Sequence, residues 1–188
     1  MRRIALLHLI LAIFFSPLIW AQHTASFVKE AKINYQKITE NLANYSNKTV
    51  PLLENSAEGA TITGYYQHSH LKMMSASWFS ETGKKSTEFY IEQGKLFFVL
   101  EKTYTYNRPI YWDATKAKNN GDDEVFDLKK SKITENRVYF KDSKIVLWLN
   151  ENQHKVEVSK QVFAAKEKEL TTQNSRLQKR LKKQKNAD

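Results

Sequence analysis

The chain contains no cysteine, and only five of its 188 residues are glycine and three are proline. The absence of cysteine excludes a disulfide scaffold, a cysteine-based zinc site and a cysteine nucleophile. The scarcity of glycine and proline excludes a collagen-like chain and a Gly/Pro-rich disordered chain. At this length the sequence predicts one domain that is large enough to bury a hydrophobic core.

One long apolar run occurs, at the start of the sequence. Arg2 and Arg3 precede a mostly apolar stretch, 4–20, which ends at the small residue Ala21. This order is typical of a signal peptide, here 1–21. A retained membrane anchor is the alternative, but a spanning helix needs about 20 apolar residues and Pro17 interrupts this run. We therefore expect an exported protein, periplasmic or extracellular, without a transmembrane segment once the signal is removed.

The spacing of apolar residues predicts an amphipathic helix within 22–50. These residues recur at steps of three and four, and they are Val28, Ala31, Tyr35, Ile38, Leu42 and Tyr45. Ser26 is a candidate N-cap, and Asn47 and Pro51 mark the expected end. We expect the helix to pack on a sheet, with partner binding as the alternative.

One motif occurs three times, at 65–71, 90–96 and 139–145. It consists of a tyrosine, a polar stretch around Ser or Gly, and then Leu or Ile, so each copy predicts a strand, a tight turn and a second strand. A fourth, degenerate copy is expected around 111–124. Because isolated hairpins are marginal in water, the copies must join one sheet.

The expected fold class is α+β, mainly antiparallel β. We predict a single meander sheet of about six to eight strands over 57–154, with the N-terminal amphipathic helix and a long C-terminal helix. The runs 96–100 and 145–149 are apolar at successive positions, which indicates that both faces of these strands are covered.

A recurring pattern is formed by Glu58-Gly59, by 64–66, by 88–96 and by 137–140. It resembles small exported bacterial β-meander proteins that have no assigned activity. The resemblance covers roughly 57–149 and implies a β-rich domain without a mechanism. The hairpin period is also similar to MORN repeats, but their regular glycines are missing, since Ser143 stands where the second copy has Gly94.

Candidate catalytic and metal-binding residues are sparse. His68 and His70 share a predicted turn, but no third ligand lies nearby. The oxygen-rich segment 119–124 lacks EF-hand spacing, so an exposed loop is preferred over a calcium site. His23 would chelate copper only after a shifted signal cleavage and together with a further histidine. No nucleophile elbow, P-loop or dinucleotide fingerprint occurs. The sequence thus predicts no catalytic residue, no metal site and no cofactor.

Aromatic residues gather around one arginine. This candidate recognition surface consists of Tyr104, Tyr106, Arg108, Tyr111 and Trp112. Aromatic rings beside arginine are favoured at recognition surfaces, including carbohydrate and peptide grooves. The alternative is that the rings belong to the core of the sheet or to a loop packed on it.

The segment 155–188 is predicted to be a basic helical tail. Val156, Phe163, Leu170 and Leu177 recur every seven residues, whereas the positions four later are mostly polar. We therefore expect one weak apolar stripe rather than a coiled coil. Its first half is expected to dock through Val158, Val162 and Phe163, and its polar end to fray.

The charge of the chain is concentrated in this tail. The net charge is +10, and the ten Lys and Arg and four Asp and Glu residues of 155–188 contribute +6, whereas 22–154 contributes +2. We expect the tail to contact an anionic envelope surface or an acidic protein. The candidate contacts are Arg176, Lys179, Arg180, Lys182, Lys183 and Lys185.

Two classes of function are compatible with the sequence. The first is an exported non-enzymatic binding or interaction protein of unknown specificity. The alternative is a small exported enzyme or enzyme inhibitor whose site is assembled from scattered residues. Export argues against nucleic acid as a partner, and the sequence leaves the oligomeric state open.

Overall fold

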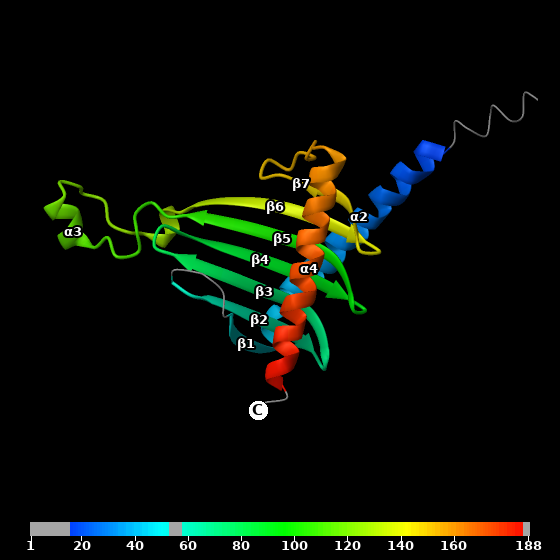
Figure 1. Cartoon of the computed structure of the whole chain (residues 1–188), viewed down its shortest axis with the longest axis horizontal. Helices are drawn as coiled ribbons and strands as arrows, with labels where there is room; N and C mark the ends of the chain where they lie inside the picture. The colour runs from blue at the N-terminus through cyan, green and yellow to red at the C-terminus, as the bar shows by residue number, and fades with distance from the viewer. Residues whose placement is uncertain (1–15, 53–57, 186–188) are drawn as a thin grey trace, which may run out of the picture.

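The computed structural model describes residues 16–52 and 58–185. Seven antiparallel strands form one sheet in the order of the sequence, with α2 on one face and α4 on the other (Figure 1). The strands are β1 (Ser46–Leu52), β2 (Ala60–Gln67), β3 (His70–Ser80), β4 (Gly83–Glu92), β5 (Lys95–Thr105), β6 (Lys132–Lys141) and β7 (Lys144–Leu149). The helices are α2 (Ser16–Glu40), α3 (Ala114–Asn119) and α4 (Lys160–Lys185), with short 3-10 turns η1 (Leu42–Asn44) and η2 (Leu128–Lys130). The expected fold class is confirmed.

The three tyrosine motifs form the three hairpin turns at one end of the sheet. Each turn has two residues, at 68–69, 93–94 and 142–143. Positive φ angles occur in all three, as the favoured two-residue hairpin turns require. The strand register also shifts directly after the first tyrosine of each copy: Tyr65, Tyr90 and Tyr139. The repeat predicted from the sequence therefore has a structural counterpart.

The prediction of a fourth copy of the motif around 111–124 is wrong. Residues 106–131 leave the sheet between β5 and β6 and form a separate projection, the β5–β6 lobe, which carries α3 and η2 (Figure 1). Asp113 caps α3 by accepting a hydrogen bond from the Lys116 amide at 2.9 Å. Asp127 caps η2 in the same way through the Lys129 amide. These local caps favour short helical turns over a hairpin.

The helix expected within 22–50 ends earlier than predicted. Residues 1–15 of the expected signal lie outside the described residues, and α2 begins at Ser16, so that Ser26 lies inside the helix rather than at an N-cap. After Glu40 the chain passes through η1 and enters β1, which the helical spacing concealed. Val50 and Leu52 of β1 are buried on the face under α4. Pro51 is tolerated because β1 is an edge strand.

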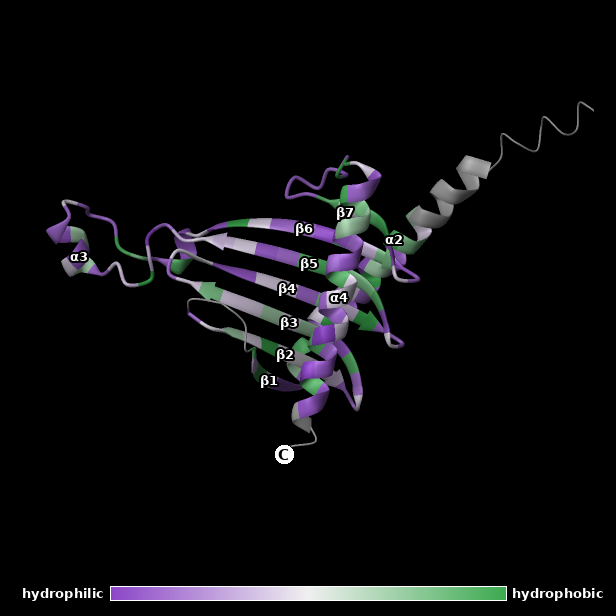
Figure 2. Ribbon diagram, in the orientation of Figure 1, coloured by the Kyte–Doolittle hydropathy of each residue, from purple (hydrophilic) through white to green (hydrophobic). Residues whose placement is uncertain are grey.

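The α2 face of the sheet has an aromatic core. Tyr35 of α2 packs edge-on against Tyr90 and Phe98, with ring centroids 5.0 and 5.1 Å apart. Ala31 and Ile38 of α2 are buried in the same cluster. Since α4 covers the opposite face, both faces of the apolar strand segments are covered, as predicted. Figure 2 shows that hydrophobic residues concentrate where the helices cross and hydrophilic ones lie toward the β5–β6 lobe.

The C-terminal helix packs along its length instead of fraying. Leu170, Leu177 and Leu181 of α4 are buried in the core of its face. Phe163 lies 6.4 Å from the Trp148 ring, whereas Val158 and Val162 are exposed and do not dock. These three leucines are enough for docking because an apolar sheet lies beneath them.

Helix α4 also contacts both edge strands of the sheet. At β7, Glu167 accepts hydrogen bonds from the Ile145 amide at 2.9 Å and from Lys144 Nζ at 2.8 Å. At β1, Arg180 Nη2 donates to the Pro51 carbonyl oxygen at 3.2 Å. The helix therefore crosses the whole sheet. None of the helices in the described part of the chain has the length and apolarity needed to span a membrane.

Candidate functional site

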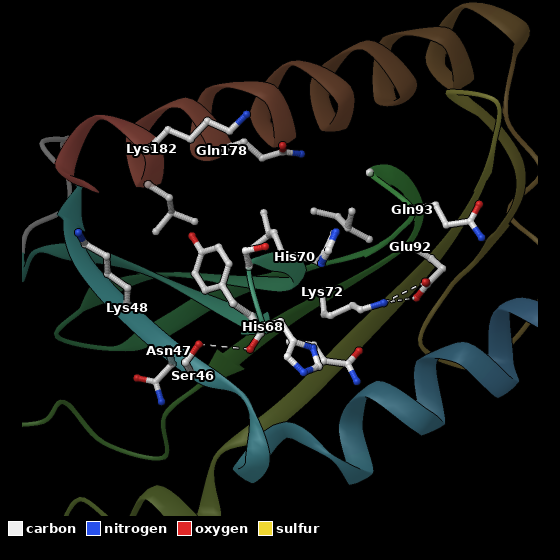
Figure 3. Close-up of a pocket in the computed structure, with 17 residues that line it drawn as sticks. Ser46, Asn47, Lys48, His68, His70, Lys72, Glu92, Gln93, Gln178 and Lys182 are labelled. Atoms are coloured by element: carbon white, nitrogen blue, oxygen red, sulfur yellow. Dashed lines mark hydrogen bonds and ion pairs between the residues drawn. The ribbon is translucent and has the colours of Figure 1, made fainter. Parts of the chain in front are cut away.

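A pocket of about 860 Å³ lies at the end of the sheet that carries the three hairpin turns. We call it the sheet-end pocket (Figure 3). Its walls come from the start of β1, the β2–β3 hairpin, the β4–β5 turn and the last turns of α4. Segments from both ends of the chain therefore build one cavity.

The local sequence explains how α4 approaches the sheet beside this pocket. Gly64 of β2 has no side chain, and a Cβ there would lie 2.8 Å from Leu181 Cδ1 and 2.9 Å from the Tyr66 hydroxyl oxygen. Glycine is used where elements approach this closely. Both Tyr66 and Leu181 line the pocket, so the glycine helps to define its shape.

The pocket has an excess of positive charge. Three lysines and one carboxylate line it, which gives a formal charge of +2 when the two histidines are neutral. Lys72 Nζ donates to both carboxylate oxygens of Glu92 at 2.9 Å. The single acid of the lining is therefore already paired with Lys72, and Lys48 and Lys182 are the other two basic residues of the lining.

The two lysines come from different elements. Figure 3 shows Lys48 on β1 and Lys182 on α4 on the same side of the pocket, away from the Lys72–Glu92 pair. Their ammonium groups point in different directions in Figure 3. A partly enclosed site weakens the attraction between a lysine and an anion less than open water does.

Neutral hydrogen-bonding groups complete the polar part of the lining. Ser46, Tyr66 and Ser69 contribute hydroxyls, and Gln178 contributes an amide. Burial raises the pKa of the Tyr66 phenol, so this hydroxyl keeps its proton and can donate. The Ser46 hydroxyl already donates to the Tyr66 carbonyl oxygen at 3.3 Å, and Gln178 Nε2 donates to Asn174 Oδ1 at 3.1 Å. The hydroxyls of Tyr66 and Ser69 are the other donors that suit an anion.

The floor of the pocket is apolar. Leu71 is half-buried, and Ile91 and Leu181 are buried beside it. All three belong to or pack against the core cluster under α4. The pocket therefore joins a charged rim to the hydrophobic core.

The structure places His68 and His70 at this pocket. His68 occupies the β2–β3 turn with a φ of 58°, and His70 begins β3. Within 16–52 and 58–185, no three His, Asp or Glu side chains gather in a way that would hold a metal ion.

The aromatic candidate surface lies at the other end of the sheet. Tyr104 is on β5, with Lys84 Nζ 4.3 Å from its ring centre, and the other four residues belong to the β5–β6 lobe. Tyr106 packs on Phe126 with ring centroids 5.2 Å apart. Tyr111 is exposed, and Lys116 Nζ lies 4.2 Å from its ring centre.

Arg108 and Trp112 are bound within the lobe. Arg108 donates to the Asp122 carboxylate through Nε at 2.6 Å and Nη2 at 3.1 Å, and lies 3.3 Å from Glu124. Trp112 Nε1 donates to the same carboxylate at 3.2 Å. The bidentate Arg108 contact holds the pKa of Asp122 at about 2. These acids of 119–124 are therefore paired with cations of the lobe.

The six basic residues of the tail have different positions. Arg176, Lys179, Lys182 and Lys183 are exposed, and Lys182 also lines the pocket. Arg180 is half-buried and bound to the Pro51 carbonyl. Lys185 is the last residue of α4. Among the five of these residues whose side chains the structure describes, Lys182 lines the sheet-end pocket.

Comparison with protein-family models, curated proteins and solved structures finds no match to this chain. The class of this protein is described by its own fold and pocket. It is a seven-stranded meander sheet between two helices, with a basic cavity at its hairpin end.

Sequence reasoning did not find this cavity. The sequence predicts the histidine turn, but it places Lys48 in the segment expected to hold a helix and predicts that the end of the C-terminal helix frays. The available signal was Leu181, which adds a buried position to the Leu170 and Leu177 stripe within the basic segment.

Proposed function

We propose that this chain is an exported, non-enzymatic binding protein that holds an anionic group of its ligand in the sheet-end pocket. The observation that supports this most directly is the lining of three lysines with one carboxylate, Glu92, which Lys72 already neutralises. Lys182 of α4 then attracts an anion beside the neutral hydrogen-bonding groups of the lining. Export rests on the sequence of 1–21.

The pocket indicates which basic residues of the tail would contact the anionic partner. An envelope surface or an acidic protein would present its negative group to Lys182 and to the exposed neighbours Lys179 and Lys183. Charged groups at a pocket rim also speed association, and salt weakens their effect. Binding is therefore expected to decrease as ionic strength rises.

Deletion of the tail is not a suitable test. Residues 176–188 include Leu177 and Leu181, which are buried in the core, so their removal would disturb the fold as well as the charge. Charge-neutralising substitutions at Lys48 and Lys182 avoid this problem. Lys118→Gln with Lys129→Gln is the matched control, since both lysines are exposed in the β5–β6 lobe.

The test is an NMR titration of the whole chain with inorganic phosphate and hexyl phosphate at constant ionic strength. We expect saturable shifts of amides around 46–48, 68–72 and 178–182 with at least one probe. In Lys48→Gln/Lys182→Gln the dissociation constant should rise about tenfold or more, as expected for charge-assisted hydrogen bonds, and the lobe control should bind like the original protein. Equal binding by both double variants, or no saturable shift with either probe, contradicts the proposal.

The same sample tests the non-enzymatic part of the proposal. Hexyl phosphate should be recovered unchanged after prolonged incubation, as seen in its phosphorus spectrum. Release of inorganic phosphate that the pocket variant abolishes would instead support the enzyme alternative.

A further inference from the structure

We propose that the face of the sheet beside α4 carries a second binding site, which takes a neutral oligosaccharide. The site shares no lining residue with the sheet-end pocket and does not depend on the function proposed above. It is a hollow of about 400 Å³, here called the sheet-face hollow, whose lining combines two tryptophan rings, polar side chains and balanced charges.

The hollow lies where α4 leaves the sheet uncovered. Helix α4 crosses near the hairpin turns, and none of the described helices lies over the strand halves that point toward the β5–β6 lobe on this face (Figure 1). Residues two apart in a strand point to the same face, so the register places two rows of side chains here. The rows are Ala76, Thr87, Glu101 and Asn136, and Trp78, Lys85, Thr103 and Thr134. Because Ala76 belongs to the core cluster under α4, both rows lie on the α4 face.

Two tryptophans line the hollow, Trp78 on β3 and Trp148 on β7. Both are partly buried and pack against the core cluster under α4. An indole that is anchored in the core and still lines a hollow offers a rigid apolar surface. The C–H groups of a sugar ring form a matching flat face, and the negative face of an aromatic ring attracts them.

The charged groups of the lining balance one another. Lys166 of α4 forms ion pairs with Glu101 at 2.8 Å and with Glu169 at 3.4 Å. Lys102 is paired with Glu88 at 3.1 Å. When Glu88 is included, the three lysines of the lining are matched by three carboxylates. Charge complementarity therefore favours a neutral ligand here, in contrast to the sheet-end pocket.

Neutral polar groups of the lining retain hydrogen-bonding capacity. Within the part of the chain that the structure describes, the side chains of Thr103, Asn136 and Gln173 form no hydrogen bond. Amides and hydroxyls both donate and accept, and sugar hydroxyls use both kinds of partner. A purely apolar ligand would leave these groups without partners, whereas a sugar offers partners to the amides and C–H groups to the rings.

The size of the hollow fits more than one sugar ring. Its volume of about 400 Å³ lies within the range of about 300 to 1,000 Å³ that is typical of small-molecule pockets. A neighbouring hollow of about 440 Å³ shares Trp78, Lys85 and Thr103 with it and continues to the turn between β3 and β4. A chain of sugars therefore has room on both sides of Trp78, and an oligosaccharide should bind more tightly than a single sugar.

The test is an NMR titration of the full chain with three neutral hexasaccharides: cellohexaose, maltohexaose and chitohexaose. We expect at least one of them to shift the indole signals of Trp78 and Trp148 saturably, whereas the Trp112 indole of the β5–β6 lobe stays in place as an internal control. The hexasaccharide should bind about tenfold or more tightly than its monosaccharide, and raised salt should leave its affinity unchanged. No saturable shift with any of the three, or binding of anionic oligogalacturonate alone, would overturn the proposal.

Substitutions in the lining test where the sugar lies. Asn136→Ala/Gln173→Ala should weaken the hexasaccharide about tenfold or more, because two hydrogen-bonding groups are lost. The matched control is Asn119→Ala/Gln161→Ala, since both residues are exposed and lie outside the hollow. Trp78→Ala should remove most of the gain from monosaccharide to hexasaccharide, and Trp78→Tyr, which keeps an aromatic surface, should retain part of it. Unfolding midpoints identify the variants that are folded, and equal binding by the two double variants would overturn the placement.

Discussion

Gly83 begins β4 directly opposite Thr105 of β5, where there is no room for a side chain. A Cβ at this position would collide with the backbone carbonyl oxygen of Tyr104. A Cβ at Gly64 would meet only the ends of the Leu181 and Tyr66 side chains, which can rotate. The two glycines therefore differ in what a substitution must move.

We expect Gly83→Ala to lower the free energy of unfolding by about 2 kcal/mol, because strand β5 must shift. Gly64→Ala should cost less, since side chains adjust more readily than backbone. Urea denaturation of both variants measures the difference. The reverse order of stability would contradict this account of β4–β5 pairing.

Asp122 gives the β5–β6 lobe a defined acid sensitivity. Hydrogen bonds from Arg108 lower its folded-state pKa to about 2, whereas the unfolded value is near 3.8. Its contribution to stability is therefore complete above about pH 4 and is lost as the pH falls toward 2. The indole N–H of Trp112, which donates to the same carboxylate, should report this change by NMR.

Asp122→Asn is the control for this prediction. The variant lacks the titrating group, so its Trp112 indole resonance should not show the acid transition with a midpoint near pH 2. An identical transition in both proteins would assign the acid sensitivity to another carboxyl.

At the scale of elements, α4 is the part of the structure that departs most from its sequence description. Leu177 is buried in the core, whereas its near neighbour Lys179 is exposed. We expect Leu177→Ala to destabilise the fold by about 2 to 5 kcal/mol, from lost burial and the cavity that remains. Lys179→Ala should stay within about 0.5 kcal/mol.

Thermal or urea unfolding of the two variants tests this placement. A frayed, solvated tail would make both substitutions equally mild. Comparable, small effects would therefore show that α4 does not pack on the sheet as described.

The whole molecule shows which parts of a fold are readable from local sequence. The three tyrosine motifs predicted the hairpins because strand and turn preferences act between neighbours in sequence. The runs at 96–100 and 145–149 predicted cover on both faces. Tyr45 misled because it continues a helical spacing, yet its ring belongs to the core beside η1.

The sheet-end pocket could not be predicted from the sequence because it forms from segments that are distant along the chain. Lys48 lies on β1 and Lys182 on α4, and both line the same pocket because α4 crosses the sheet. That crossing depends on the burial of three leucines against the sheet. The weak apolar stripe that they form in a basic segment does not by itself predict this packing. The sequence does predict the histidine turn, because the tyrosine motif that contains it has a recognisable turn between two strands.

The two contacts of α4 with the edge strands also bear on how the protein is made. Glu167 covers the Ile145 amide of β7, and Arg180 covers the Pro51 carbonyl of β1. Both residues belong to α4, which follows every strand of the sheet in the sequence. A nascent chain that has already formed every hairpin still lacks these two covers, and an uncovered edge is a template for pairing with another chain. Protection of the sheet edges against self-association therefore depends on α4, which is synthesised after all seven strands.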